Sequence, residues 1–147
     1  MLQIYWRECL MSVKLTRDGE VAVVTLNRPE ALNALSFQII EDIGNAITEA
    51  ITSDARILIF TGAGDKAFCA GADIKELRDQ NTNSMRAAMG KGQATFAKLD
   101  IIQIPSIALI NGYAFGGGLE LALACTFRLA TPNAKVGLPE IKLGIIP

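Results

Sequence analysis

Three consecutive glycines, Gly116 to Gly118, lie where the sequence predicts that a buried strand ends and a helix begins. The apolar run at residues 104–110 predicts the strand, and the strong helix formers of residues 119–125 predict the helix. Glycine lets a backbone approach a ligand closely, and the first turn of a helix has unpaired amides and partial positive charge. This stretch therefore predicts a site for a negatively charged oxygen, with the carboxylate of Glu120 one turn away. An isolated glycine triplet would be better explained by a tight turn beside an exposed glutamate.

Three further motifs favour the anion-binding site over the simple turn. Residues 68–75 (FCAGADIK) form a second small-residue turn that leads into a predicted helix, and residues 139–147 (PEIKLGIIP) bring a second carboxylate, Glu140. Residues 28–35 read RPEALNAL. In this order and spacing, the four motifs resemble the enoyl-CoA hydratase (crotonase) family, from about Ser12 to the last residue.

The resemblance implies an α/β fold, a crotonase-like spiral of repeated β-β-α units. Family chains continue beyond the point that corresponds to Pro147, with helices that cover the acyl pocket and build a trimer. The resemblance thus implies that residues 12–147 are the N-terminal core of a crotonase-like domain that lacks its C-terminal helical region. Because Met11 precedes the first predicted strand, we expect residues 1–11 to be a disordered leader or a misassigned start.

The resemblance also implies acyl-CoA thioester substrates and the hydration of trans-2-enoyl-CoA to 3-hydroxyacyl-CoA in fatty-acid or related metabolism. The backbone amides of Ala72 and Gly117 match the family's oxyanion hole. Glu120 and Glu140 match its two catalytic glutamates, and we expect Glu120 to act as the base and Glu140 as the acid. The expected substrate-binding positions are Ala31, Leu32, Ala70, Asp73, Ile74, Lys75, Gly116, Pro139 and Leu143.

The same resemblance implies no metal and no cofactor other than the coenzyme A of the substrate, and a homotrimer or a dimer of trimers. Arg28 begins the N-terminal motif, but a solvated salt bridge explains it equally well.

Three alternative functions stay open: an isomerase or dehydratase of the same fold, an inactive truncated relative that acts in assembly, and a dinucleotide-binding oxidoreductase. The last rests on residues 61–67, which match G-x-G-x-x-A, but we interpret this match as a chance one because no clear helix is predicted to open at Gly64.

Composition narrows the chemistry further. The chain contains no histidine, which excludes Ser-His and Cys-His mechanisms and leaves acid–base work to groups such as carboxylates. Its 3 cysteines are far apart, which argues against a disulfide framework or a zinc site. A net charge of −1 gives no basis for binding nucleic acid or an anionic membrane. With no evident secretory signal or spanning segment, we expect a cytoplasmic protein.

Elsewhere, hydrophobic periodicity and turn residues predict alternating strands and helices, which is typical of α/β layering. Asp18-Gly19 predicts a hairpin, Ser36 is expected to cap a helix, and residues 80–84 are expected to form a polar loop. The expected strands cover residues 13–16, 21–26, 56–61, 127–130 and 135–138, and the expected helices cover residues 36–52, 73–79 and 85–99. We expect Gly90 and Gly92 to interrupt the last of these helices.

Overall fold

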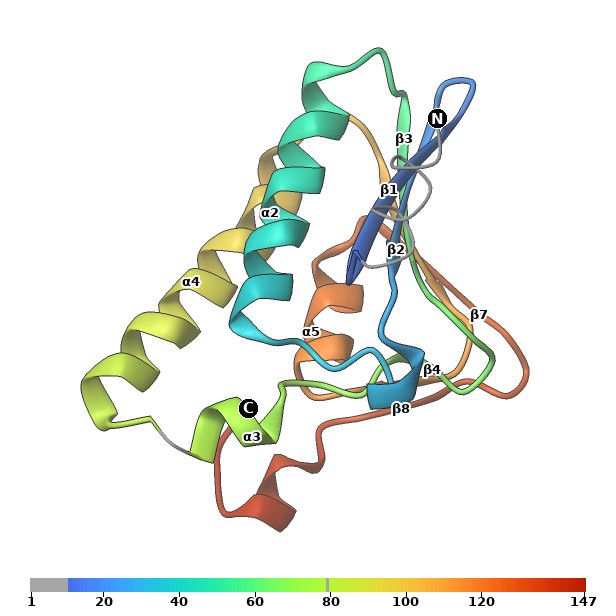
Figure 1. The fold of residues 1–147 in the computed structure, drawn as a ribbon. Coiled ribbons are helices and arrows are strands. Elements are labelled where there is room, and N and C mark those ends of the chain that lie inside the picture. The colour runs from blue at the N-terminus through green and yellow to red at the C-terminus, as the bar shows by residue number, and fades with distance from the viewer. Residues whose placement is uncertain (1–10, 79) are drawn as a thin grey trace, which may run out of the picture.

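Two sheets built mainly from parallel strands form the frame of the molecule (Figure 1). The computed structural model describes residues 11–78 and 80–147. The larger sheet has the order β1-β2-β3-β5-β7, and the smaller sheet has the order β4-β6-β8. Their strands are β1 Val13–Asp18, β2 Val21–Leu26, β3 Ile57–Gly62, β4 Ala67–Cys69, β5 Ser106–Ile110, β6 Tyr113–Phe115, β7 Phe127–Ala130 and β8 Lys135–Gly137.

The described chain repeats one unit, in which a strand of the larger sheet is followed by a strand of the smaller sheet and then by a helix. After β3 and β4 come α3 (Ile74–Arg78) and α4 (Thr82–Ile101), and after β5 and β6 comes α5 (Gly117–Ala124). After β7 and β8 comes the 3₁₀ helix η2 (Pro139–Leu143). Strands β3, β5 and β7 run parallel, and parallel neighbours require a crossover connection. The helices between them supply it. The predicted succession of β-β-α units is confirmed.

The first unit differs because β1 and β2 form an antiparallel hairpin, with Gly19 in the turn at φ +57°. A short 3₁₀ helix, η1 (Pro29–Ala31), then leads to α2 (Phe37–Thr52). Ser36 caps α2 as expected, since its hydroxyl accepts a hydrogen bond from the amide of Ile39.

The hydrophobic core lies between the larger sheet and the helices that cover it. Ile43 and Ile47 of α2 are fully buried at helical spacing, and Leu58 and Phe60 of β3 are fully buried on the facing side of the sheet. Helix α4 packs beside α2, and α5 lies between these helices and the sheets (Figure 1). Removing these side chains from water is the main force that holds the layers together. No helix in the described ranges is long and apolar enough to span a membrane.

Three expectations about local structure are wrong. The expected polar loop at residues 80–84 is largely the start of α4, because the side chain of Asn81 accepts a hydrogen bond from the amide of Ser84 and caps the helix at Thr82. Gly90 does not interrupt α4. The short strands β4 and β6 are not among the expected strands, since three residues are too few for a clear alternating pattern. The expected leader, apart from Met11, and the end of the expected helix at residue 79 lie outside the described residues.

Candidate active site

Two glycine turns face each other at the end of the smaller sheet. Strand β6 ends at Phe115, and α5 begins at Gly117, so Gly116 forms the link with φ +51° and ψ −127°. Opposite it, Gly71 follows β4 with φ +102°. A Cβ atom at Gly71 would lie 3.0 Å from the carbonyl oxygen of Phe115 and 3.7 Å from the amide nitrogen of Gly117. Only glycine combines these backbone angles with so close an approach.

The amides of Ala72 and Gly117 lie on these two turns. The nitrogen of Ala72 is 3.9 Å from the position that a Cβ atom would take on Gly117. An isolated bridge joins Ala72 to Leu35, but its hydrogen bonds are made by the amides of Leu35 and Asp73. Outside regular helices and strands, no backbone bond of the described chain has the amide of Ala72 or Gly117 as donor. Both are therefore candidates to bind one oxygen of a ligand.

Both predicted glutamates meet at the same turn. Glu120 lies in the first turn of α5, and its Oε2 is 3.7 Å from the Cβ position of Gly117. Glu140 comes from η2, and its Oε1 is 2.6 Å from the Cβ position of Gly116. Partial burial raises the pKa of the Glu120 carboxyl, and the nearby charge of Glu140 raises it further. Within the described residues, the Oε2 atom of Glu140 is buried without a hydrogen-bond partner.

The expected substrate-binding positions surround this turn on three segments. Ala31 ends η1, Leu32 follows it, and the amide of Ala70 donates to the carbonyl of Leu32, which joins η1 to the Gly71 turn. Asp73 continues that turn. Ile74 and Lys75 begin α3, and Pro139 and Leu143 are the two ends of η2. The side chains of Ile74 and Leu143 are largely exposed. The structure thus brings Gly116 against Glu140 and joins Leu32 to Ala70, whereas it leaves Ile74 and Leu143 open to solvent.

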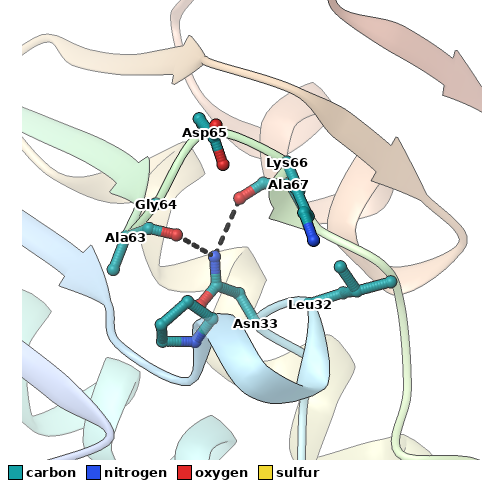
Figure 2. A pocket seen from close by; sticks show the side chains of 8 residues that line it. Leu32, Asn33, Ala63, Gly64, Asp65, Lys66 and Ala67 are labelled. Atoms are coloured by element: carbon teal, nitrogen blue, oxygen red, sulfur yellow. Dashed lines mark hydrogen bonds between the residues drawn. The ribbon is translucent and has the colours of Figure 1, made fainter.

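A cavity of about 160 Å³ adjoins this region between η1 and the β3–β4 connection (Figure 2). Asn33, only 1% exposed, closes one side by donating from its amide to the carbonyl oxygens of Ala63 and Ala67, at 3.0 and 2.8 Å. Its side-chain oxygen accepts from the amide of Arg28. Asn33 is not among the expected site residues, although asparagine tolerates its φ of +56° better than most residue types do.

The same loop carries the G-x-G-x-x-A match. After Gly64 the chain enters β4 and not a helix, so no helix N-terminus is available there for a pyrophosphate. The interpretation of this match as a chance one is therefore supported. Leu35 was also missed: its Cδ1 lies 3.2 Å from the Cβ position of Gly117 and forms an apolar wall of the site.

A comparison with known proteins decides the family, because the sequence profile described as Enoyl-CoA hydratase/isomerase matches residues 16–147. The chain belongs to the enoyl-CoA hydratase/isomerase family. It is 46% identical over 140 residues to the short-chain-enoyl-CoA hydratase of Clostridium acetobutylicum, covering 94% of this chain and 53% of that protein. It is 42% identical over 138 residues to the crotonyl-CoA hydratase of Syntrophomonas wolfei, covering 92% and 53%.

Solved structures in this enoyl-CoA hydratase/isomerase family show the fold. The crystal structure of an enoyl-CoA hydratase from Bacillus anthracis superposes with a TM-score of 0.89 at 40% identity, covering 93% of this chain and 54% of that one. The fold is thus crotonase-like, as the sequence motifs predicted. The chain spans about half the length of the relatives that it matches.

Proposed function

We propose that this family member hydrates trans-2-enoyl-CoA thioesters to 3-hydroxyacyl-CoA. One observation carries the proposal: two carboxylates, from α5 and η2, meet at the glycine turn that lies beside the amide nitrogen of Ala72. The identity to relatives named short-chain-enoyl-CoA and crotonyl-CoA hydratases supports a short enoyl chain.

In this proposal, the amides of Ala72 and Gly117 bind the thioester oxygen of the substrate. When water adds across C2=C3, negative charge develops on that oxygen as an enolate forms. Two fixed donors stabilise this charge without reorganising, and removing one such donor typically costs about 3 kcal/mol of barrier. The N-terminus of α5 adds its dipole to the same oxygen.

The two glutamates divide the proton transfers. Glu120 accepts a proton from the water while the oxygen of that water bonds to C3. Glu140 gives a proton to C2, so that one water is added overall. The raised pKa of Glu120 suits a base, because a carboxylate that holds its proton more strongly is a better acceptor near neutral pH. The unpaired Oε2 of Glu140 offers a buried position from which a proton can reach the substrate.

We propose that coenzyme A lies along η1 and α3, where Ala31, Leu32, Ala70, Asp73, Ile74 and Lys75 are placed. Pro139 and Leu143 border the acyl side, beside Glu140. The proposal requires neither a metal nor a second cofactor.

For the full-length protein we propose a cytoplasmic homotrimer or dimer of trimers that acts in acyl-CoA metabolism. Exposed apolar side chains support an assembly, since Phe127 and Leu129 of β7 and Val136 of β8 are each more than half exposed. Surface of this kind is typical of interfaces.

The test is turnover of crotonyl-CoA by the purified full-length protein, followed as loss of its enoyl absorbance. Hydration that falls by orders of magnitude in both Glu120→Gln and Glu140→Gln supports the proposal. The family's description also includes isomerases, so a 3-enoyl-CoA is assayed in parallel. Conversion of the 3-enoyl-CoA without hydration of crotonyl-CoA would replace the hydratase by an isomerase, and CoA-ester binding without turnover of either would indicate a non-catalytic relative.

A further inference from the structure

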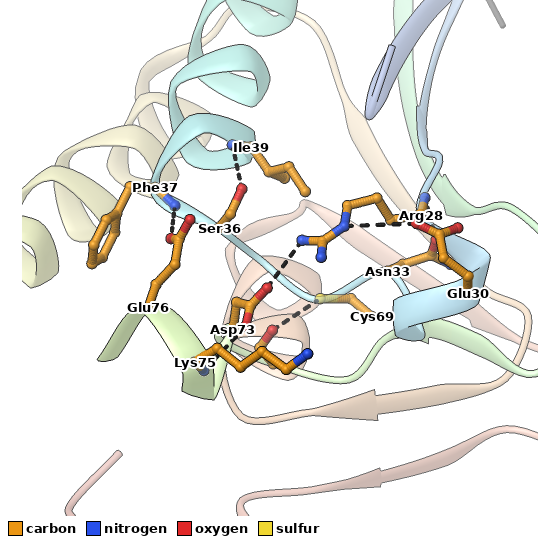
Figure 3. A network of polar contacts seen from close by, with 11 residues as sticks. Arg28, Glu30, Asn33, Ser36, Phe37, Ile39, Cys69, Asp73, Lys75 and Glu76 are labelled. Carbon is orange, nitrogen blue, oxygen red and sulfur yellow. Dashed lines mark hydrogen bonds and ion pairs between the residues drawn. The ribbon is translucent and has the colours of Figure 1, made fainter. Parts of the chain in front are cut away.

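The loop that carries Ala72 is tied to a distant segment by an ion pair (Figure 3). The Nη1 atom of Arg28 donates to Oδ2 of Asp73 at 3.1 Å, joining the residue before η1 to the residue directly after Ala72. The side chains of Arg28 and Asp73 are only 28% and 16% exposed. Such a partly buried pair is screened less than a surface pair and constrains its two segments more strongly.

Asp73 also begins the following helix. Its Oδ1 accepts from the amide of Lys75 at 3.2 Å, and its carbonyl accepts from the amides of Glu76 and Leu77. The two oxygens of one carboxylate therefore have separate partners: one fixes the start of α3 and the other binds Arg28.

A second contact links helix α3 to helix α2. Oε2 of Glu76 accepts from the amide of Phe37 at 2.7 Å, which satisfies an unpaired donor at the start of α2 (Figure 3). Ala72 is thus followed by a short helix that is held to η1 through Asp73 and to α2 through Glu76. These contacts fix the backbone on the C-terminal side of the Ala72 amide.

We propose that Arg28 and Asp73 are positioning residues that aim the Ala72 amide at the developing negative charge. The inference rests on the proposed function. The amide of Leu35 donates to the carbonyl of Gly71, which belongs to the same peptide as the Ala72 N–H, and the ion pair holds the residue that follows Ala72. An oxyanion hole depends on donor direction, and a small misplacement reduces transition-state stabilisation more than ground-state binding.

The test compares Arg28→Gln, Asp73→Asn and the double variant, in the full-length protein with crotonyl-CoA. We expect each single variant to lower kcat about tenfold or more, with KM changed by less than about threefold. The double variant should be no slower than the worse single one, because both changes remove the Arg28–Asp73 contact and Arg28→Gln alone already removes the longer ion pair of Arg28 with Glu30 at 3.9 Å. Arg28→Lys should recover part of the loss, since it keeps the charge but not the planar fork of donors.

The chain offers a matched control. Arg17 and Asp54 form another Arg–Asp ion pair at 2.7 Å, on the hairpin side of the larger sheet and outside the site, although Asp54 is exposed where Asp73 is not. Arg17→Gln and Asp54→Asn should leave kcat and KM unchanged. The melting temperature of every variant is measured, so that unfolding is recognised separately.

Ligand binding supplies a readout that a purely structural role would not move. Acetoacetyl-CoA can bind as its enolate, which carries charge on the thioester oxygen, whereas butyryl-CoA cannot. We expect Arg28→Gln and Asp73→Asn to weaken acetoacetyl-CoA binding at least fivefold more than butyryl-CoA binding. Equal weakening of both, or a raised KM with unchanged kcat, would overturn the inference and indicate a direct role in binding CoA. A wild-type protein that does not hydrate crotonyl-CoA would instead refute the proposed function.

Discussion

The carboxylate of Glu140 lies directly against the backbone of Gly116, with Oε1 only 2.6 Å from where a Cβ atom would stand. This contact joins η2 to the turn between β6 and α5, two segments separated by β7 and β8 in the sequence. The position of one proposed catalytic group therefore depends on the absence of a side chain at another residue.

Gly116→Ala should displace Glu140 and abolish most of the activity. The new methyl group overlaps the end of a side chain that can move aside, so the fold should survive while the carboxylate leaves its place. The φ of +51° adds strain of about 2 kcal/mol. We expect kcat on crotonyl-CoA to fall about 100-fold with a moderately lowered melting temperature.

Gly90→Ala is the matched control. Gly90 lies in α4 with no atom within 4 Å of its Cβ position. The substitution should stabilise the protein by about 0.5–1 kcal/mol and leave kcat unchanged. A Gly116→Ala variant as active as Gly90→Ala would contradict the placement of Glu140.

Glu140→Gln should move the acidic limb of the pH profile to lower pH. Glu120 must be ionised to accept a proton, so kcat/KM falls as the pH drops through its pKa. Partial burial and the charge of Glu140 both hold that pKa above its ordinary value. Removing the Glu140 charge deletes the second cause and keeps the first, so the pKa of Glu120 should fall part of the way. The residual kcat/KM of Glu140→Gln, measured from pH 4 to 8, should decline at a lower pH than that of the wild type. An unchanged limb would show that Glu120 does not sense Glu140.

The fold could largely be anticipated from the sequence because its long elements carry repeating patterns. Helix α2 has isoleucines at helical spacing and a serine cap, and the β1–β2 hairpin has alternating strands around a glycine turn. The elements that were missed are short. Strands β4 and β6 obtain their hydrogen bonds from neighbours that are distant in the sequence, so no local pattern marks them.

The site was anticipated less completely, for a similar reason. Gly116 and Glu120 are marked by a glycine triplet at a helix start, but their approach to Glu140 depends on how β7 and β8 return the chain. The link from Arg28 to Asp73 crosses 45 positions and has no spacing that a sequence could reveal. Asn33 and Glu76 look like ordinary polar residues until the backbone groups that they bind are known.

Glu120→Gln should raise the stability of the protein near neutral pH. The folded state holds the Glu120 proton more strongly than the unfolded state, because burial and Glu140 raise its pKa. Stability therefore falls as pH rises through the window between the ordinary pKa of 4.5 and the raised value, and glutamine escapes this loss. The melting temperature of Glu120→Gln should exceed that of the wild type at pH 7, and the difference should shrink as the pH approaches 4. Glu49→Gln, at an exposed position of α2, provides the control. A variant that is less stable than the wild type at pH 7 would contradict this view of the site.

Cys69 and Cys125 should resist thiol reagents in the native protein. Burial raises the pKa of each thiol to about 12, so almost no reactive thiolate exists near neutral pH. Cys69 lies in β4 beneath the Gly71 turn and Cys125 directly after α5, so access requires these elements to separate. In a Cys9→Ser background, a chromogenic disulfide reagent at pH 8 should find no thiol in the native state and two thiols in denaturant. Opening of the site by Gly116→Ala should leave this protection intact, because that substitution displaces a side chain and not a strand. Rapid labelling of Cys69 in the wild type would mean that the smaller sheet does not hold the two glycine turns together as described.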